Sequence, residues 1–153
     1  MTHGIETLDI VEPWLIALLK GASLVDHVVN AQTAEAIKPP YLLVSQISSR
    51  DILGVGTIRI DTDSIYMIKV IHQVNSFIPG RATMQAVDDL LHGVTATTSN
   101  GSVTCIRETM FHYPETVDGV QFMHVGANYR IRASATSDET SMLPVTIPFT
   151  IGA

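Results

Sequence analysis

The sequence predicts an α+β fold, a single domain in which a mainly antiparallel sheet of about four strands packs against two or three helices. Residues 64–74 are rich in β-branched and aromatic side chains, which are typical of a strand. Residues 81–92 repeat apolar side chains at helical spacing. Residues 103–113 and 120–133 read as two strands joined across an Asp-Gly pair, a strong hairpin signal. A sheet with a helix across it is therefore the expected core.

Two helices are expected near the N-terminus. Pro13 is tolerated in the first turn of a helix, and an apolar stripe follows it as far as Lys20-Gly21. Ser23 can cap a second, short helix, because Asp26 stands three positions later as in a capping box. The buried side of this second helix would be formed by Leu24, Val25, Val28 and Val29.

Three further elements follow in the predicted domain. Pro39-Pro40 forbids a helix and leads an extended chain into a first strand at residues 41–47. Residues 64–74 are apolar on both alternating faces, which indicates a central strand buried on both sides. A helix then begins near Pro79 and ends at Gly93. Its buried face would consist of Met84, Val87 and Leu91, widened by Ala86 and Leu90.

Residues 50–63 are the least regular part of the chain, and the polar turn expected at residues 95–102 separates the helix from the last hairpin. The first of these stretches is more apolar than a solvated loop requires. One interpretation is a projecting hairpin or long loop that contacts another molecule, and the other is a loop that folds back on its own core. The candidate contact residues are Leu53, Val55, Ile58 and Ile60.

The C-terminal residues 137–153 are expected to form an extended arm beyond a domain of residues 1–136. Pro144 and Pro148 lie on the same side of an extended strand, so only one edge of the arm lacks donors and the other is free to pair. Burying its apolar side chains offers at best ~8 to 15 kcal/mol, whereas ordering nine residues costs about 9 to 18 kcal/mol. The arm would thus dock on a partner's sheet or, alternatively, on its own domain. Its candidate contact residues are Leu143, Val145, Ile147 and Phe149.

Composition narrows the class of protein. The chain has 153 residues and a net charge of −6, and its nine Lys and Arg are scattered, which disfavours a role in gripping nucleic acid. Cys105 is the only cysteine, so neither an intrachain disulfide nor a cysteine-based zinc site can form. No signal peptide and no apolar run of about 20 residues is present, so we expect a soluble protein that is not a membrane protein.

No motif points to catalysis or to a cofactor. There is no P-loop, dinucleotide fingerprint or Gly-x-Ser-x-Gly elbow, and the six histidines lack metal-ligand spacing. His112 and His124 lie on the two arms of the predicted hairpin, where they could approach each other as a metal or proton-relay site. Asp61 and Asp63 are better explained as an acidic turn than as cation ligands. We expect no enzyme, cofactor or metal; the alternative is a small enzyme or ligand-binding domain with His72, His112 or His124 near a pocket.

A family resemblance adds to this picture. The residues that carry it are an apolar helix at Trp14 to Leu19, the strand opening at Pro40-Tyr41, the strand and helix of residues 66–91, and a Tyr113-Pro-Glu-Thr turn that leads into Tyr129-Arg-Ile-Arg. Their order resembles the tail terminator proteins of long-tailed bacteriophages, also called tail completion or head-to-tail joining proteins. The resemblance covers about residues 8–135 and includes no catalytic signature.

The resemblance implies an α+β subunit of a homo-oligomer, expected to be a hexameric ring. Such a ring caps the tail tube in the virion, stops its growth and joins it to the neck of the head, with the tail-tube protein and a head-completion protein as partners. The protein would be made in the host cytoplasm. DNA would only pass through the ring, and surplus negative charge would repel its phosphates. The acids suggested to line the channel are Asp51, Asp61, Asp63, Glu115 and Asp118. Another tail-tube or connector component is the alternative within this class.

Overall fold

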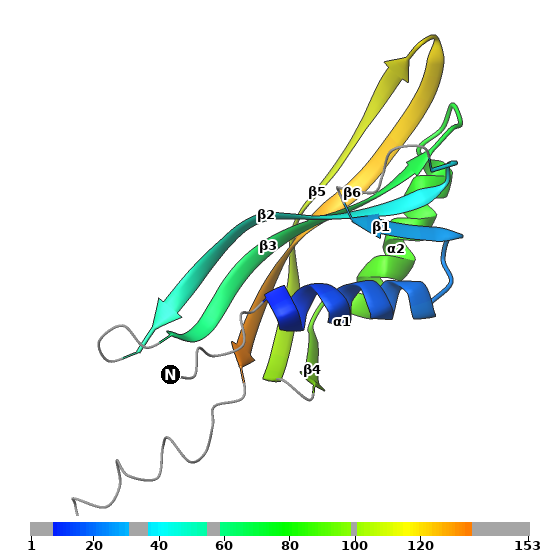
Figure 1. The fold of residues 1–153 in the computed structure, drawn as a ribbon. Coiled ribbons are helices and arrows are strands. Elements are labelled where there is room, and N and C mark those ends of the chain that lie inside the picture. The colour runs from blue at the N-terminus through cyan, green and yellow to red at the C-terminus, as the bar shows by residue number, and fades with distance from the viewer. Residues whose placement is uncertain (1–7, 31–36, 55–58, 99–100, 136–153) are drawn as a thin grey trace, which may run out of the picture.

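The computed structural model describes residues 8–30, 37–54, 59–98 and 101–135. Figure 1 shows a curled sheet with two helices on one of its faces. The elements are α1 (Leu8–Gly21), β1 (His27–Asn30), β2 (Tyr41–Leu53), β3 (Arg59–His72), α2 (Ile78–Leu91), β4 (Val94–Thr98), β5 (Gly101–Val117) and β6 (Val120–Ala135).

Within the described residues, six strands form one sheet in the order β1-β2-β3-β6-β5-β4. β1 pairs with β2 in parallel, and every other pairing is antiparallel. The β2–β3 and β5–β6 pairs continue beyond the rest of the sheet and project in opposite directions (Figure 1). The subunit is therefore elongated, with a hairpin at each end.

The predicted fold class is wrong in its strand number and its balance of elements. We expected about four strands on two or three helices, whereas six strands curl into a half-barrel with two helices. The expected second helix is instead strand β1, in which Val29 pairs with Leu43. β-branched valines favour a strand once a neighbouring strand is available to pair with. Ser23 does not begin a helix; it has a φ of 54° in the turn after α1.

A second strand was hidden in the expected polar turn at residues 95–102. Val94–Thr98 forms β4, which pairs antiparallel with Gly101–Cys105 of β5. Threonine is polar but β-branched, so a threonine-rich run suits the outermost strand of a sheet, where one side of each residue meets water.

The irregular stretch at residues 50–63 belongs largely to the β2–β3 hairpin. Arg50 to Leu53 pairs with residues 59–63 of β3, with irregularities after Gln46 and after Ile52. Of the two interpretations, the described residues match a projecting hairpin. The N-terminal helix also begins earlier than expected, at Leu8, so that Pro13 lies inside α1 rather than in its first turn.

Three predictions are confirmed: the central strand, the helix after it and the last hairpin. β3 lies in the middle of the sheet, although only its helix-facing side is fully buried and the other side is half-buried. α2 buries Met84, Val87 and Leu91 as predicted. In the last hairpin the strands continue to Val117 and restart at Val120, so the turn is shorter than expected.

The core lies between the helices and the sheet face that they cover. β3 contributes Tyr66, Ile68 and Val70 to it, and β6 contributes alternate residues from Val125 to Ala133. α2 approaches the sheet closely at Gly80, where a Cβ atom would lie 2.6 Å from Val125 Cγ2. The largest fully buried side chains of the core are Tyr66, Tyr129, Leu15, Leu19, Leu42, Ile68, Met84, Leu91 and Ile131.

Candidate functional site

The sheet face turned away from α1 and α2, called the open face here, carries a row of charged side chains. Asp61 of β3 accepts hydrogen bonds from Ser134 and from Arg132 of β6, whose Nε lies 2.9 Å from Oδ2. The hydrogen bond from Ser134, supported by Arg132, lowers the pKa of the Asp61 carboxyl against the opposing effect of burial. The Asp61 carboxylate is therefore ionised and already bonded to side chains of its own subunit.

Asp63 lies next along the same row. Its Oδ2 is 3.4 Å from Arg50 of β2, and its Oδ1 is 3.7 Å from Nε of Arg130. Arg130 also lies 2.8 Å from Glu108 of β5. Acids and bases thus alternate across four strands, and most of their charge is neutralised inside one subunit.

A second polar cluster lies where the β5–β6 hairpin leaves the sheet. His124 is 4% exposed, stacks on Tyr113 at 4.4 Å and places Nε2 2.7 Å from Glu115. Lys69 donates a 2.8 Å hydrogen bond to the Tyr113 hydroxyl. Burial, and then the Lys69 charge, lower the pKa of His124, while Glu115 acts in the opposite direction. This network ties the hairpin to β3.

The paired-histidine site suggested by the sequence does not form. His112 pairs with Val125 and His124 with Tyr113, so the two imidazoles belong to opposite faces of the hairpin. His112 makes an edge-to-face contact with Phe77 instead. Within the described ranges, no three His, Cys, Asp or Glu side chains come together as metal ligands would.

On the helix side of the sheet, one polar group links α2 to the strands. Asp88 accepts a 3.1 Å hydrogen bond from the Tyr129 hydroxyl and lies 3.1 Å from Arg107. Burial next to Asp88 raises the pKa of the Cys105 thiol to about 12, so this thiol stays protonated. These contacts hold α2 against the sheet.

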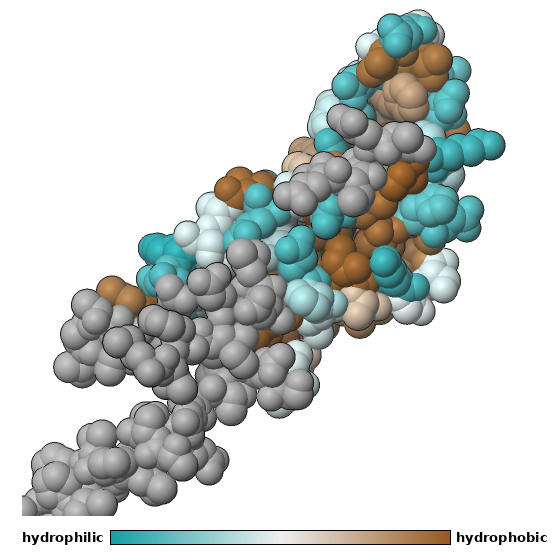
Figure 2. Space-filling view, in the orientation of Figure 1, coloured by the Kyte–Doolittle hydropathy of each residue, from teal (hydrophilic) through white to brown (hydrophobic). Residues whose placement is uncertain are grey.

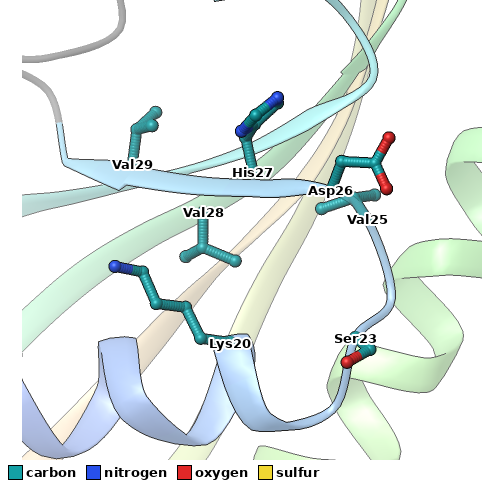
Figure 3. A pocket seen from close by; sticks show the side chains of 7 residues that line it. All are labelled: Lys20, Ser23, Val25, Asp26, His27, Val28 and Val29. Carbon is teal, nitrogen blue, oxygen red and sulfur yellow. The ribbon is translucent and has the colours of Figure 1, made fainter.

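A hollow of about 520 Å³ opens between the end of α1 and β1 (Figure 3). Val28 and Lys20 point into the space between the two elements, whereas His27 and Val29 point to the other side of β1. His27, which lines this hollow, is not one of the three histidines that the sequence suggested near a pocket. The lining residues are Lys20, Ser23, Val25, Asp26, His27, Val28 and Val29.

The predicted contact residues are only partly within the described chain. Leu53 lies on the β2–β3 hairpin and is 53% exposed. Residue 60 lies in β3, but nothing is described of its side chain. Val55, Ile58, Leu143, Val145, Ile147 and Phe149 lie outside the described residues, as does the boundary between domain and arm.

The five acids suggested for the channel are spread over both hairpins. Asp51, Asp61 and Asp63 belong to the β2–β3 hairpin, whereas Glu115 and Asp118 belong to the other one. Asp118 occupies the turn with a φ of 50°. Whether any of them faces DNA stays a prediction. Asp61 and Asp63 are paired with arginines, which reduces the negative potential that these two carboxylates present.

Sequence reasoning missed a set of exposed apolar side chains on β5. Ile106 and Met110, which lie in a predicted strand, and Val117, which was expected in the turn after it, are about half exposed. Figure 2 shows hydrophobic side chains reaching the surface near the tip of the β5–β6 hairpin. The alternation of residues in the strand could have suggested this, but the side of β5 that lacks a neighbour is visible only in the sheet order.

No helix of the described residues is long and apolar enough to cross a membrane.

Comparisons with known proteins find a similar fold in solved structures. No family model matches the chain, and no curated protein matches it. A chain from the virion of a native gene transfer agent particle is similar in structure, with a TM-score of 0.51 and 20% identity over 78% of this chain and 84% of that one. A second solved chain is 17% identical over 78% of this chain and 89% of that one, with a TM-score of 0.48. The first similarity indicates a shared fold.

Proposed function

We propose that this protein is a structural component of a phage-like virion, a tail terminator that forms a ring at the head-proximal end of the tail. In that place it ends growth of the tail tube and joins the tail to the head while DNA passes through. The observation that carries the proposal is the fold shared with a chain of a gene transfer agent virion over 78% of this chain. The role is one of assembly, not of catalysis.

The shape of the subunit supports a role in assembly. A hairpin projects from each end of the sheet, and both hairpins carry exposed apolar side chains such as Leu53 and Val117. A solitary soluble protein gains nothing from two such projections, because isolated hairpins are marginally stable in water. Contacts with neighbouring subunits would cover both.

The charge of the subunit is compatible with a passage for DNA. Each copy carries −6, so a hexamer carries −36 (six times −6), and three arginines of the open face, Arg50, Arg130 and Arg132, are engaged by acids. A channel lined by part of this surplus would repel phosphates and let DNA slide. The tail-tube protein and a head-completion protein are the partners that this role requires.

Electron microscopy of the purified protein, alone and mixed with tails that lack it, tests the proposal. We expect six-fold rings, or rings that close on the tail end, and tails that then join heads. Native mass spectrometry should show masses that are multiples of 16.6 kDa. A monomer that neither binds tails nor promotes joining would contradict the proposal, and long polymers would favour a tail-tube subunit instead.

A further inference from the structure

Two strands of the sheet lose a neighbour partway along their length. β2 has β1 beside it only from Tyr41 to Val44, so no described strand lies on that side from Ser45 to Leu53. β5 has β4 beside it only from Gly101 to Cys105. The backbone amide of Arg107 then donates to His92, and beyond it no described strand lies beside residues 109–117. The two stretches contain nine residues each.

Exposed apolar side chains gather on these two strands. Nine large apolar residues of the described chain are prominently exposed, and six of them stand on the unflanked parts of β2 and β5 or directly beside them. An exposed apolar strand edge tends to pair with another chain, so natural proteins cover such an edge or place charged residues on it. The six are Ile47, Leu53, Ile106, Met110, Tyr113 and Val117.

The two edges also differ in charge. The β2 edge presents Arg50, whose side chain is 76% exposed. From residue 109 to residue 129 the β5–β6 hairpin has no Lys or Arg, and it presents Glu115 at the β5 edge. Arg50 pairs with Asp63 and Glu115 with Phe122, and both positions belong to the open face. Arg50 contacts Asp63 and Glu115 contacts His124 within one copy, yet their side chains are 76% and 49% exposed, so each can also reach an opposite charge on a neighbouring copy.

We propose that the β2 edge of one copy pairs with the β5 edge of the next copy, so that one sheet continues from subunit to subunit. This inference rests on the proposed ring. The contact between the β2 edge of one copy and the β5 edge of the next is called the seam. β2 and β5 run in opposite directions within one copy, so copies that point the same way along a ring axis would pair these edges antiparallel.

One antiparallel register satisfies the side chains best. Placing Arg50 opposite Glu115 of the next copy also places Ile52 opposite Tyr113, all on the open face. It places Ser48 opposite Val117 as well. Cross-strand pairs of opposite charge and of aromatic with β-branched residues both stabilise a ladder.

The head-to-tail arrangement is favoured over symmetric pairing. A symmetric dimer through β5 would leave the β2 edge uncovered in both copies and would place two edges without Lys or Arg against each other. A β2-to-β5 contact covers both apolar edges in every copy with a single kind of interface, and a contact of this kind closes into a ring or continues as a filament.

Local irregularities make the seam selective. The bulge after Gln46 interrupts the β2 ladder, and Pro114 has no N–H to donate from β5. An arbitrary strand would therefore form few continuous hydrogen bonds with either edge. Matching side chains have to supply the remaining binding free energy. Asp51 already has contacts in its own copy, and the seam does not depend on it.

Cysteine cross-linking of the full-length protein tests the seam. The double variant S48C/V117C should give a ladder of covalent oligomers up to the hexamer on mild oxidation, because facing Cβ atoms lie about 4.5–5.5 Å apart. Within one copy the two positions are separated by β3 and β6, a spacing of about 14 Å, so an internal disulfide is impossible. Buried Cys105 does not interfere. The matched control is A17C/A82C on the exposed helix surfaces, which should stay monomeric on denaturing gels.

A charge exchange gives a second readout that does not need cysteine. R50E and E115R should each weaken a seam by up to about five-fold, and R50E/E115R should recover much of the loss. Thermal melting of each variant checks that the subunit itself is folded. Recovery in the double variant would show coupling between copies, because the two residues are on separate hairpins of one subunit.

The outcomes separate this inference from the proposed function. A ladder for S48C/V117C with single variants that stay uncross-linked supports the seam. Dimers of V117C alone, or of S48C alone, would overturn it in favour of symmetric pairing. Rings seen by electron microscopy without any cross-linked ladder and without charge recovery would overturn the seam and leave the proposed function standing. The absence of both rings and tail joining would overturn both.

Discussion

Tyr66 and Tyr129 face each other across β3 and β6, and both are fully buried. Their hydroxyls differ in one respect. The Tyr129 hydroxyl donates to Asp88, whereas the Tyr66 hydroxyl has no hydrogen-bond partner among the described residues. A buried polar atom without a partner costs free energy, while a bonded one contributes about 0.5–1.5 kcal/mol.

The pair gives a prediction with its own control. Tyr129→Phe should lower the free energy of unfolding by about 1 kcal/mol, because Asp88 loses a donor and keeps only Arg107. Tyr66→Phe should leave stability unchanged or raise it slightly. Urea denaturation of both variants measures the difference, and equal losses would contradict the assignment of the two hydroxyls.

Gly126 makes a second prediction at the residue scale. A Cβ atom there would lie 2.6 Å from Phe111 Cζ and from Lys69 Cβ, and 2.7 Å from the Ile68 carbonyl oxygen. The backbone oxygen cannot move aside cheaply, so Gly126→Ala should destabilise the fold by roughly 1–3 kcal/mol and lower the melting temperature. Gly21→Ala is the control, because nothing lies within 4 Å of that position. A normal melting temperature for Gly126→Ala would be inconsistent with the packing of Phe111.

Two histidines, His124 and His72, predict a loss of stability in mild acid. Burial lowers the pKa of His124 and of His72 below 6.5, so the unfolded chain binds protons that the folded chain resists. Stability should therefore be full above about pH 6.5 and fall as the pH drops toward the folded pKa values. His124→Gln should flatten this slope, as measured by urea midpoints between pH 5 and pH 8. An unchanged slope would show that His124 does not resist protonation.

At the scale of elements, the β5–β6 turn requires two consecutive residues with positive φ. Asp118 and Gly119 have φ values of 50° and 79°, the type I′ geometry that Asp-Gly suits. Gly119→Ala should cost roughly 1–2 kcal/mol locally, because an L-residue resists the left-handed conformation. Hydrogen exchange at the turn amides should rise, while Asp118→Asn, which tolerates this conformation, should leave exchange unchanged. Equal exchange in both variants would argue against the turn geometry.

The C-terminal arm gives a prediction that stands from the sequence alone. A chain ending at Thr136 should melt at an unchanged temperature but join tails or neighbours poorly. Differential scanning calorimetry and a tail-joining assay test the two halves of this statement. A large drop in melting temperature would place the arm in its own core instead.

Elements with several local signals could be predicted, and those that depend on distant pairing could not. The helix at residues 78–91 was found because Pro79, the Met84-Val87-Leu91 spacing and Gly93 agree. β1 has only four residues, and nothing local distinguishes Val28-Val29 in a helix from the same pair in a strand. Its parallel pairing with β2 decides the matter, and that contact is invisible in the chain order.

The polar sites follow the same rule. Asp61 and Asp63 were singled out by sequence, yet their partners Arg132 and Arg130 lie about 70 positions later in the chain. Only the β3–β6 register brings them together. For His112 and His124 the hairpin itself was predicted correctly. The register of its strands places the two side chains on opposite faces, which the sequence did not show. Site geometry therefore depends on register, which a single sequence does not fix.

At the scale of the whole molecule, the sheet order divides the chain at one point. α1, β1, β2 and β3 lie between Leu8 and His72, and α2, β4, β5 and β6 lie between Ile78 and Ala135, so each half is contiguous in sequence. Among the described strands, the ladder of β3 and β6 is the sole sheet contact between the halves.

The two halves are joined by this ladder and by the shared core, in which α1 packs against β6 and α2 packs against β3. If the linker around Asn75 were nicked, the fragments would be expected to find each other and restore the whole, since neither strand triplet is interrupted. The β3–β6 ladder pairs residues 51 to 71 positions apart, so its formation closes a long loop and is expected to be slow.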